Sequence, residues 1–126
     1  MEIRFTAREL DVMSVLWDRG PSTVAEVRRA LDDDLAYNTV LTVLRILEEK
    51  GHVTHEEEGR AHRYLPLVER EQAGESALRR LTRRLFSGSP ELLLTRLVEG
   101  EELSGEEVRR MRDLLAKRLE EMEDDA

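Results

Sequence analysis

Residues 36–51, AYNTVLTVLRILEEKG, decide the fold. Val40, Val43, Leu44 and Leu47 recur at steps of three and four residues, which is typical of the buried face of an α-helix, and Gly51 suits the left-handed position that ends a helix. The polar residues of the same stretch then fall on the opposite face, and these are Asn38, Thr39, Thr42 and Arg45. The stretch predicts a helix that is buried on one side and polar on the other.

Two further helices are predicted before this one. Thr6-x-x-Glu9 and Thr23-x-x-Glu26 are capping boxes, in which the two side chains satisfy free backbone amides at a helix start. The apolar residues that follow at helical spacing are Leu10, Met13, Leu16 and Trp17 in the first helix, and Val24, Val27 and Leu31 in the second.

A β-hairpin is predicted after the three helices. HVTHEEE and RAHRYLPLV alternate apolar and polar residues around Glu58-Gly59, a pattern that favours two strands joined by a glycine turn. Three short helices followed by a hairpin form a winged helix-turn-helix. We therefore expect a mainly α fold with a small β-hairpin, in which residues 1–68 form a DNA-binding domain.

The composition changes to helix formers from Glu69 onward. Ser89-Pro90 and Ser104-x-x-Glu107 mark the starts of two later helices. The last helix carries an apolar stripe close to a heptad repeat, formed by Val108, Met111, Leu115, Leu119 and Met122. Three helices with so few aromatic residues are not expected to close a core alone, so residues 69–126 are interpreted as a helical dimerisation domain. Folding of these helices onto the N-terminal domain is the alternative.

The charge and the cysteine count restrict the function. A net charge of -8 argues against nucleic-acid binding in general, but the acidic residues cluster at 32–34, at 56–58 and in the tail, which leaves Arg45, Arg60 and Arg63 as a local basic surface. The absence of cysteine excludes disulfides, thiolate metal sites and cysteine nucleophiles, and is compatible with a reducing cytoplasm. No apolar run approaches the roughly 18 residues of a membrane span. We expect a soluble cytoplasmic protein without membrane insertion.

Motifs for catalysis and for metal binding are missing. The sequence has no nucleophile elbow, no phosphate-binding glycine loop and no metalloprotease helix motif. His52, His55 and His62 lie on the predicted hairpin, but they lack cysteine partners and the tight spacing of two ligands on a helix. We expect no enzyme activity, no cofactor and no metal site.

The third predicted helix has the residues of a DNA-reading helix. The second helix of a helix-turn-helix enters the major groove, where Asn pairs with adenine, the Thr methyl and hydroxyl suit thymine or phosphate, and Arg reaches phosphate or guanine. Threonine is a poor choice for a solvated helix surface because its β-branch lowers helix propensity, so Thr39 and Thr42 indicate a selected face. A merely solvated polar face is the alternative.

The hairpin tip brings two arginines and a histidine to the position where a wing meets the DNA backbone or the minor groove, although a solvated hairpin is the alternative. The candidate DNA-binding residues are Tyr37, Asn38, Thr39, Thr42, Arg45, Arg60, His62 and Arg63.

Four segments, spread over essentially the whole length of the chain, carry a resemblance to a known family: FTARELDVMSVLW, AYNTVLTVLRILEEKG, GRAHRYLPLV and LVEGEELSGEEV, of which the middle two are the most specific. Through them the chain resembles the penicillinase repressor family, which includes the methicillin-resistance repressor and copper-responsive repressors. The resemblance implies a bacterial homodimeric repressor that sits on a palindromic DNA operator and blocks RNA polymerase. It also implies that Thr39 and Thr42 lie on the recognition helix, and that the wing contacts phosphate from Arg60 to Tyr64.

Two departures from the family concern its signal. In β-lactam-responsive members a membrane sensor protease triggers cleavage at an Asn-Phe bond, and the matching position here is Arg96-Leu97, so inactivation by that cleavage is in doubt. Copper-responsive members use a cysteine cluster that this chain lacks. Thiolate copper sensing is therefore excluded. A membrane sensor protease or its signalling pathway is retained as an expected partner.

These observations predict a homodimeric DNA-binding transcriptional repressor. A winged-helix adaptor that binds proteins without specific DNA binding is the main alternative. A further alternative is a ligand-sensing winged-helix regulator with a pocket between the dimer helices.

Overall fold

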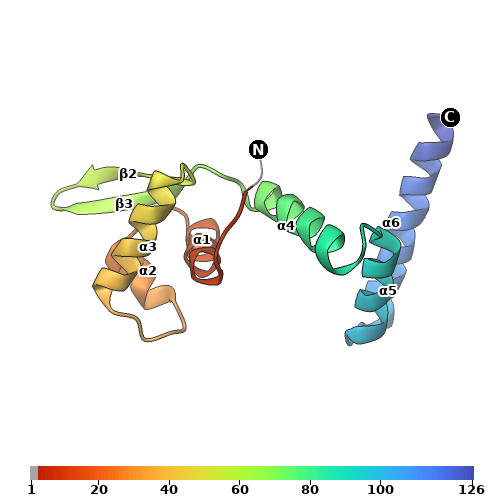
Figure 1. The fold of residues 1–126 in the computed structure, drawn as a ribbon, viewed down its shortest axis with the longest axis horizontal. Helices are drawn as coiled ribbons and strands as arrows, with labels where there is room; N and C mark the ends of the chain where they lie inside the picture. Colours follow the sequence, from red (N-terminus) through yellow and green to blue (C-terminus); the bar gives the residue numbers. More distant parts are fainter. Residues whose placement is uncertain (1–2) are drawn as a thin grey trace. The chain divides into compact units, whose positions relative to one another are not determined.

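The structure is a computed structural model that describes residues 3–126 and divides into two compact units, one ending at Leu81 and one spanning Thr82–Ala126. The first unit combines helices with an antiparallel hairpin (Figure 1), and a further short strand completes a three-stranded sheet, which confirms the mainly α fold class. Its elements are α1 (Ala7–Arg19), β1 (Ser22–Thr23), α2 (Val24–Ala30), α3 (Tyr37–Glu49), β2 (Val53–Glu58), β3 (Ala61–Pro66) and most of α4 (Arg70–Leu85).

Capping boxes start the first two helices, as the sequence predicts. The Thr6 hydroxyl accepts from the Glu9 amide at 3.1 Å, and the Glu9 carboxylate accepts from the Thr6 amide at 2.8 Å. Thr23 and Glu26 repeat this exchange at 3.2 and 2.9 Å. Each box satisfies amides that the first turn of a helix leaves without partners.

Helix α3 ends in a Schellman motif, which confirms the predicted role of Gly51. Gly51 has φ +82, its amide donates to the Glu48 carbonyl at 3.0 Å, and the His52 amide donates to the Leu47 carbonyl at 3.0 Å. Glycine adopts this left-handed conformation without the steric cost of a Cβ atom. The chain therefore leaves α3 at a defined angle and enters β2 directly.

The core of the first unit lies where α1, α2, α3 and the sheet meet. Val40, Leu44 and Leu47 of α3 are fully buried, and Leu41 and Val43 pack against the edge of the core. The other buried core residues are Val12, Met13, Val15, Leu16, Val24, Val27, Val53 and Tyr64. This packing fixes which face of α3 points outward.

Leu10 has the helical spacing of the apolar residues in α1, but it does not belong to the buried face of the helix. Its side chain is 45% exposed, and the buried face of α1 instead runs through Val12, Met13, Val15 and Leu16. Leu10 precedes Val12 by two residues, so it lies roughly 200° around the helix from it.

The sheet has the strand order β1-β3-β2, with all pairs antiparallel. Glu58 pairs with Ala61, so the hairpin loop consists of Gly59 and Arg60 alone. Gly59 has φ +62 and Arg60 has no positive φ, which fits a type II′ turn with glycine at its first central position. The hairpin is confirmed. The sequence does not predict strand β1, which pairs Ser22 with Tyr64 and Thr23 with Arg63.

The first unit continues past residue 68, the boundary expected from composition, because α4 is tied to the N-terminal segment. The Trp17 indole donates to the Val68 carbonyl at 2.9 Å, and the Arg70 guanidinium lies 5.5 Å from the centre of the Trp17 ring. The Ser76 hydroxyl exchanges two hydrogen bonds with the Ile3 backbone, each of 3.1 Å. The compact unit accordingly extends along α4 to Leu81.

The second unit has no buried residue between Thr82 and Ala126. It contains the end of α4, then α5 (Pro90–Gly100) and α6 (Gly105–Asp124). Ser89 caps α5 in front of Pro90, and Ser104 and Glu107 form the capping box of α6, as predicted. Within residues 3–126, no helix combines the length and the apolar character that crossing a bilayer requires.

Candidate nucleic-acid interface

The outward face of α3 carries the five residues that the sequence assigns to DNA reading. Tyr37, Asn38, Thr39, Thr42 and Arg45 are all exposed. They are held in register because Val40, Leu44 and Leu47 on the opposite face have no exposed surface. The helix is therefore both part of the core and the support of a polar surface.

Three of these side chains are available to a ligand. Across residues 3–126, no hydrogen bond or ion pair engages the side chains of Asn38, Thr39 or Arg45. The Thr42 hydroxyl is the exception, because it donates to the Asn38 carbonyl at 2.8 Å. Since a hydroxyl has one proton, Thr42 presents its methyl group and oxygen lone pairs outward but no donor.

The hairpin brings two more candidate residues to its outer end. Arg60 occupies the second position of the two-residue loop, is exposed, and forms no ion pair with any described residue. His62 is exposed and stacks on His55, with ring centres 4.2 Å apart and planes 10° apart. His55 is held in turn by Glu48 of α3, whose carboxylate lies 2.6 Å from Nδ1. The rings therefore join the inner face of the wing to the end of α3.

Tyr64 lies beneath this ring pair and is almost fully buried. Burial raises the pKa of its phenol, and the carboxylate of Glu48 adds to the effect. The phenol is therefore neutral at physiological pH and acts as a packing group between the wing and α3.

Arg63 differs from the other candidate residues because its guanidinium is already engaged. Its Nε donates to Glu58 at 2.5 Å, and one terminal nitrogen donates to Glu26 at 2.8 Å and to the Pro21 carbonyl at 3.1 Å. The carboxylates of Glu58 and Glu26 hold the pKa of Arg63 above its ordinary value. Arg63 therefore joins parts of the fold, whereas Arg60 is available to a ligand.

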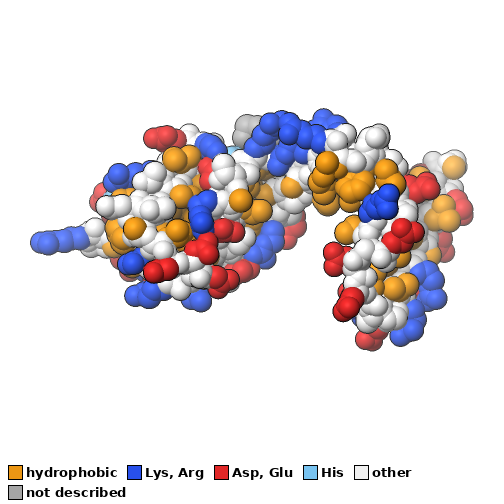
Figure 2. Space-filling model, turned by 60° about the horizontal axis from the view of Figure 1, so that its bottom comes forward, with side chains coloured by type: hydrophobic (Ala, Val, Ile, Leu, Met, Phe, Trp, Pro, Cys, Tyr) orange, Lys and Arg blue, Asp and Glu red, His pale blue; other side chains and the backbone are white. Residues whose placement is uncertain are grey.

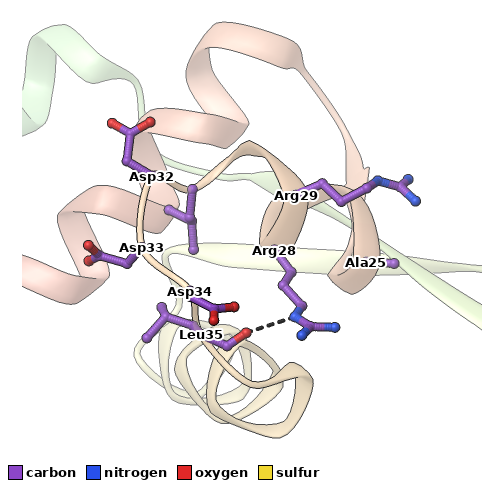
Figure 3. A pocket seen from close by; sticks show the side chains of 8 residues that line it. Ala25, Arg28, Arg29, Asp32, Asp33, Asp34 and Leu35 are labelled. Carbon is purple, nitrogen blue, oxygen red and sulfur yellow. Dashed lines mark hydrogen bonds between the residues drawn. The ribbon is translucent and has the colours of Figure 1, made fainter.

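The turn between α2 and α3 is fixed by a contact that the sequence does not reveal. Arg28 of α2 reaches across a surface pocket and donates from Nε to the Leu35 carbonyl at 2.7 Å, while Arg29 points away from the turn (Figure 3). Arg8 of α1 holds the same turn by pairing with Asp33 at 2.5 Å. The start of α3 is thereby positioned by α1 and α2 together.

Acidic and basic side chains are interspersed over the visible face of the first unit, and Lys and Arg side chains project from its hairpin end (Figure 2). Several acids are neutralised locally, since Asp33 pairs with Arg8 and Glu58 with Arg63. Placement of charge therefore matters more than the net charge of the chain, because Arg45 and Arg60 have no such pair among residues 3–126.

The three histidines are not brought together. His52 is buried and packs edge-on against Phe5, with ring centres 5.0 Å apart, away from the stacked pair of His55 and His62. Within the described part of the chain, no three residues of the types His, Cys, Asp and Glu are grouped as metal ligands.

Known proteins are similar to this chain in sequence and in fold. The sequence profile of the penicillinase repressor family matches residues 5–117. The chain is 28% identical over 109 residues to the penicillinase repressor of Bacillus licheniformis, covering 85% of each chain. It is 46% identical over 67 residues to the transcriptional regulator BlaI of Mycobacterium tuberculosis, covering 51% of this chain and 49% of that one.

Solved structures give the same fold. The DNA-binding domain of the repressor BlaI matches with a TM-score of 0.50 and 29% identity, covering 57% of this chain and 93% of that domain. A MarR family protein from Bacillus stearothermophilus matches with a TM-score of 0.52 and 20% identity, covering 95% of this chain and 76% of that one. The second likeness shows the fold alone, and the two together confirm the winged helix.

Proposed function

Because this chain belongs to the penicillinase repressor family, we propose that it represses transcription by binding a specific DNA operator as a homodimer. The family consists of transcriptional repressors and not of enzymes. One observation carries the proposal. The outward face of α3 presents Asn38, Thr39 and Arg45, and no hydrogen bond or ion pair within residues 3–126 engages their side chains.

In this proposal α3 lies in the major groove, which is wide enough for one helix. Asn38 pairs with adenine through its amide, and Arg45 reaches guanine or phosphate. Tyr37 and Thr39, at the start of the helix, contact base edges or the adjacent backbone, and Thr42 offers its methyl group to thymine. The buried face of α3 keeps these side chains in one register.

The wing supplies contacts that do not depend on DNA sequence. Arg60 at the hairpin tip binds a phosphate, and His62 lies beside it on the same hairpin. Such contacts set the register of the protein on the duplex and make its affinity depend on salt.

A second copy of the chain is proposed as the partner of α6. The exposed fractions of Val108, Leu115, Leu119 and Met122 are 44, 54, 57 and 55%, and these residues follow heptad-like spacing on one helix. Two half-sites about one helical turn apart then combine two weak contacts into a specific one. A membrane sensor protease or its signalling pathway is proposed as a further partner, and the resemblance to the β-lactam-responsive members supports it.

The test compares binding to DNA selected from a random-sequence pool with binding to random DNA. Thr42→Ala is expected to weaken binding to the selected DNA far more than to random DNA, because it removes a groove contact and no charge. Thr95→Ala is the matched control, since Thr95 also donates to the carbonyl four residues earlier, but in α5. Equal losses on both DNAs with Thr42→Ala contradict the reading role. If the unmodified protein forms no specific, salt-sensitive complex with DNA, the adaptor alternative is favoured.

A further inference from the structure

The side chain of Arg63 connects the hairpin to the segment around β1 and the start of α2, which lies 37 to 42 positions earlier in the sequence. It lies on β3, where it pairs with Thr23 of β1 on one side and Glu56 of β2 on the other. Its Nε binds Glu58 near the end of β2, and its Nη1 binds Glu26 in the first turn of α2 as well as the Pro21 carbonyl before β1. We call Arg63, Glu58, Glu26 and the Pro21 carbonyl the Arg63 clamp.

The carboxylate of Glu26 is itself held in place. The oxygen that accepts from Arg63 also accepts from the Thr23 amide at 2.9 Å, as part of the capping box of α2. The bonds from Thr23, followed by the charge of Arg63, lower the pKa of Glu26, so the carboxylate is ionised at neutral pH. Arg63 therefore binds an acceptor whose position is fixed by the start of α2.

The clamp lies where pairing between β1 and β3 stops, at Arg63, and the free end of the wing begins. The loop of the hairpin contains only Gly59 and Arg60, so strand β3 transmits the orientation of its base to the tip. A forked guanidinium that binds acceptors on both sides restricts rotation of the hairpin about its base more than a point charge does.

We propose that Arg63 is a positioning residue, which sets the angle of the wing against α2 and so places Arg60 on the DNA backbone, and that it does not itself contact phosphate. This proposal rests on the proposed DNA-binding function. Moving Arg63 to a phosphate breaks its bonds to Glu58 and Glu26 and leaves two carboxylates unpaired beside the polyanion. Arg60 carries no such cost, because no described residue pairs with it.

Glu26→Gln separates the two roles because they predict opposite changes. Gln keeps the oxygen that accepts from Thr23, so the capping box is retained, while the negative charge that holds Arg63 is removed. If Arg63 contacts phosphate, the substitution releases it and binding tightens. If Arg63 positions the wing, the clamp loosens and binding weakens.

Glu57→Gln is the matched control, because Glu57 is exposed on β2 and forms no ion pair with any residue in 3–126. Both variants remove one negative charge near the wing. We expect Glu26→Gln to bind the selected DNA about three- to tenfold more weakly than Glu57→Gln. Equal or tighter binding by Glu26→Gln overturns the proposal. Arg63→Lys, which keeps the charge but loses the fork, is expected to bind weakly as well, and normal binding by this variant also overturns the proposal.

A double-substitution cycle distinguishes positioning from general destabilisation. Loosening the clamp lowers the contribution of Arg60, so Glu26→Gln and Arg60→Ala together are expected to cost less affinity than the sum of the two. Additive costs contradict positioning.

A measurement without DNA keeps the clamp separate from the proposed function. Hydrogen exchange of the β2 and β3 amides is expected to be faster in Glu26→Gln than in Glu57→Gln, while α1 amides are unchanged. Unchanged β3 exchange rejects the clamp, whereas faster exchange in a protein that binds no DNA rejects only the proposed function.

Discussion

Lys50→Met is expected to destabilise the first unit because it leaves a buried carboxylate without its cation. The Glu9 side chain is 5% exposed, and the Lys50 ammonium donates to both of its oxygens, at 2.9 and 2.8 Å. This pair joins the first turn of α1 to the residue that caps the end of α3. It therefore fixes the far end of the proposed reading helix.

The cost follows from the unequal burial of the two groups. Removing one partner of a fully buried pair costs about 3–5 kcal/mol, but the Lys50 side chain is 41% exposed and water reaches its end of the pair. We therefore expect a loss of about 2 kcal/mol, or roughly 10 °C in Tm for a unit of this size. Glu9→Gln is expected to cost about 1 kcal/mol or less, since Gln keeps the capping box and Lys50 returns to water.

The assay is chemical denaturation of the full chain, followed by a signal from Trp17. Adding Glu9→Gln to Lys50→Met is expected to restore part of the lost stability, because the buried charge is then removed. The reasoning is refuted if Lys50→Met costs no more than Glu9→Gln, or if the double variant is simply the sum of the two.

The same pair predicts a dependence of stability on pH. Burial raises the pKa of Glu9, but the bonds from Lys50 and Thr6 outweigh it, so the folded pKa lies below the ordinary value of 4.5. The contribution of Glu9 to the free energy of unfolding is therefore complete above pH 4.5, and it is lost as the pH falls through the lowered pKa. We expect the stability difference between the parent and Lys50→Met to narrow as the pH falls from above 4.5, because burial raises the pKa of Glu9 once Lys50 is removed and protonation then removes the stranded charge. A difference that stays constant with pH contradicts the assignment.

Three further predictions concern the core, the reading face and the wing. Leu44→Ala, at a fully buried position, is expected to cost about 2–5 kcal/mol in denaturation, whereas Ile46→Ala, at a 40% exposed position, costs clearly less, and equal costs contradict the packing of α3. Thr42→Val is expected to bind selected DNA nearly as well as the parent, because the hydroxyl proton is already used within the helix. Thr42→Ser loses a methyl contact of about 0.8 kcal/mol, which lowers the affinity roughly fourfold per half-site. If Thr42→Ser instead binds more tightly than Thr42→Val, the hydroxyl contacts the DNA. Arg60→Ala is expected to reduce the slope of log affinity against log salt by about 0.9 for each half-site that the dimer binds, and an unchanged slope moves Arg60 off the phosphate backbone.

The features that the sequence predicts well are those that depend on neighbouring residues. A capping box needs residues three positions apart, and the Thr6, Thr23 and Ser104 boxes all form as predicted. The Gly51 cap and the Gly59 turn are likewise local, because each follows from the φ that its own position requires. The apolar residues of α3 recur at steps of three and four residues, so their spacing predicts which face of the helix is buried and which is exposed.

The features that the sequence does not predict depend on residues that meet only in the folded chain. Strand β1 is two residues long and exists because β3 lies beside it, so no periodic pattern indicates it. Glu9 and Lys50 are 41 positions apart, and nothing in the local sequence links them. The place of Arg63 after the hairpin tip predicts a DNA contact, but its acceptors Glu26 and Pro21 come from the other side of the sheet, beside β1.

Selection of DNA from a random-sequence pool by the unmodified chain tests the central claim most directly. The proposed homodimer, which reads DNA through the outward face of α3, predicts enrichment of an inverted repeat whose half-sites lie about one helical turn apart. It also predicts that Thr42→Ala loses the preference for thymine at one position of each half-site, whereas Thr95→Ala preserves it. A pool that stays random, or that converges on a single half-site bound by one chain, contradicts the claim.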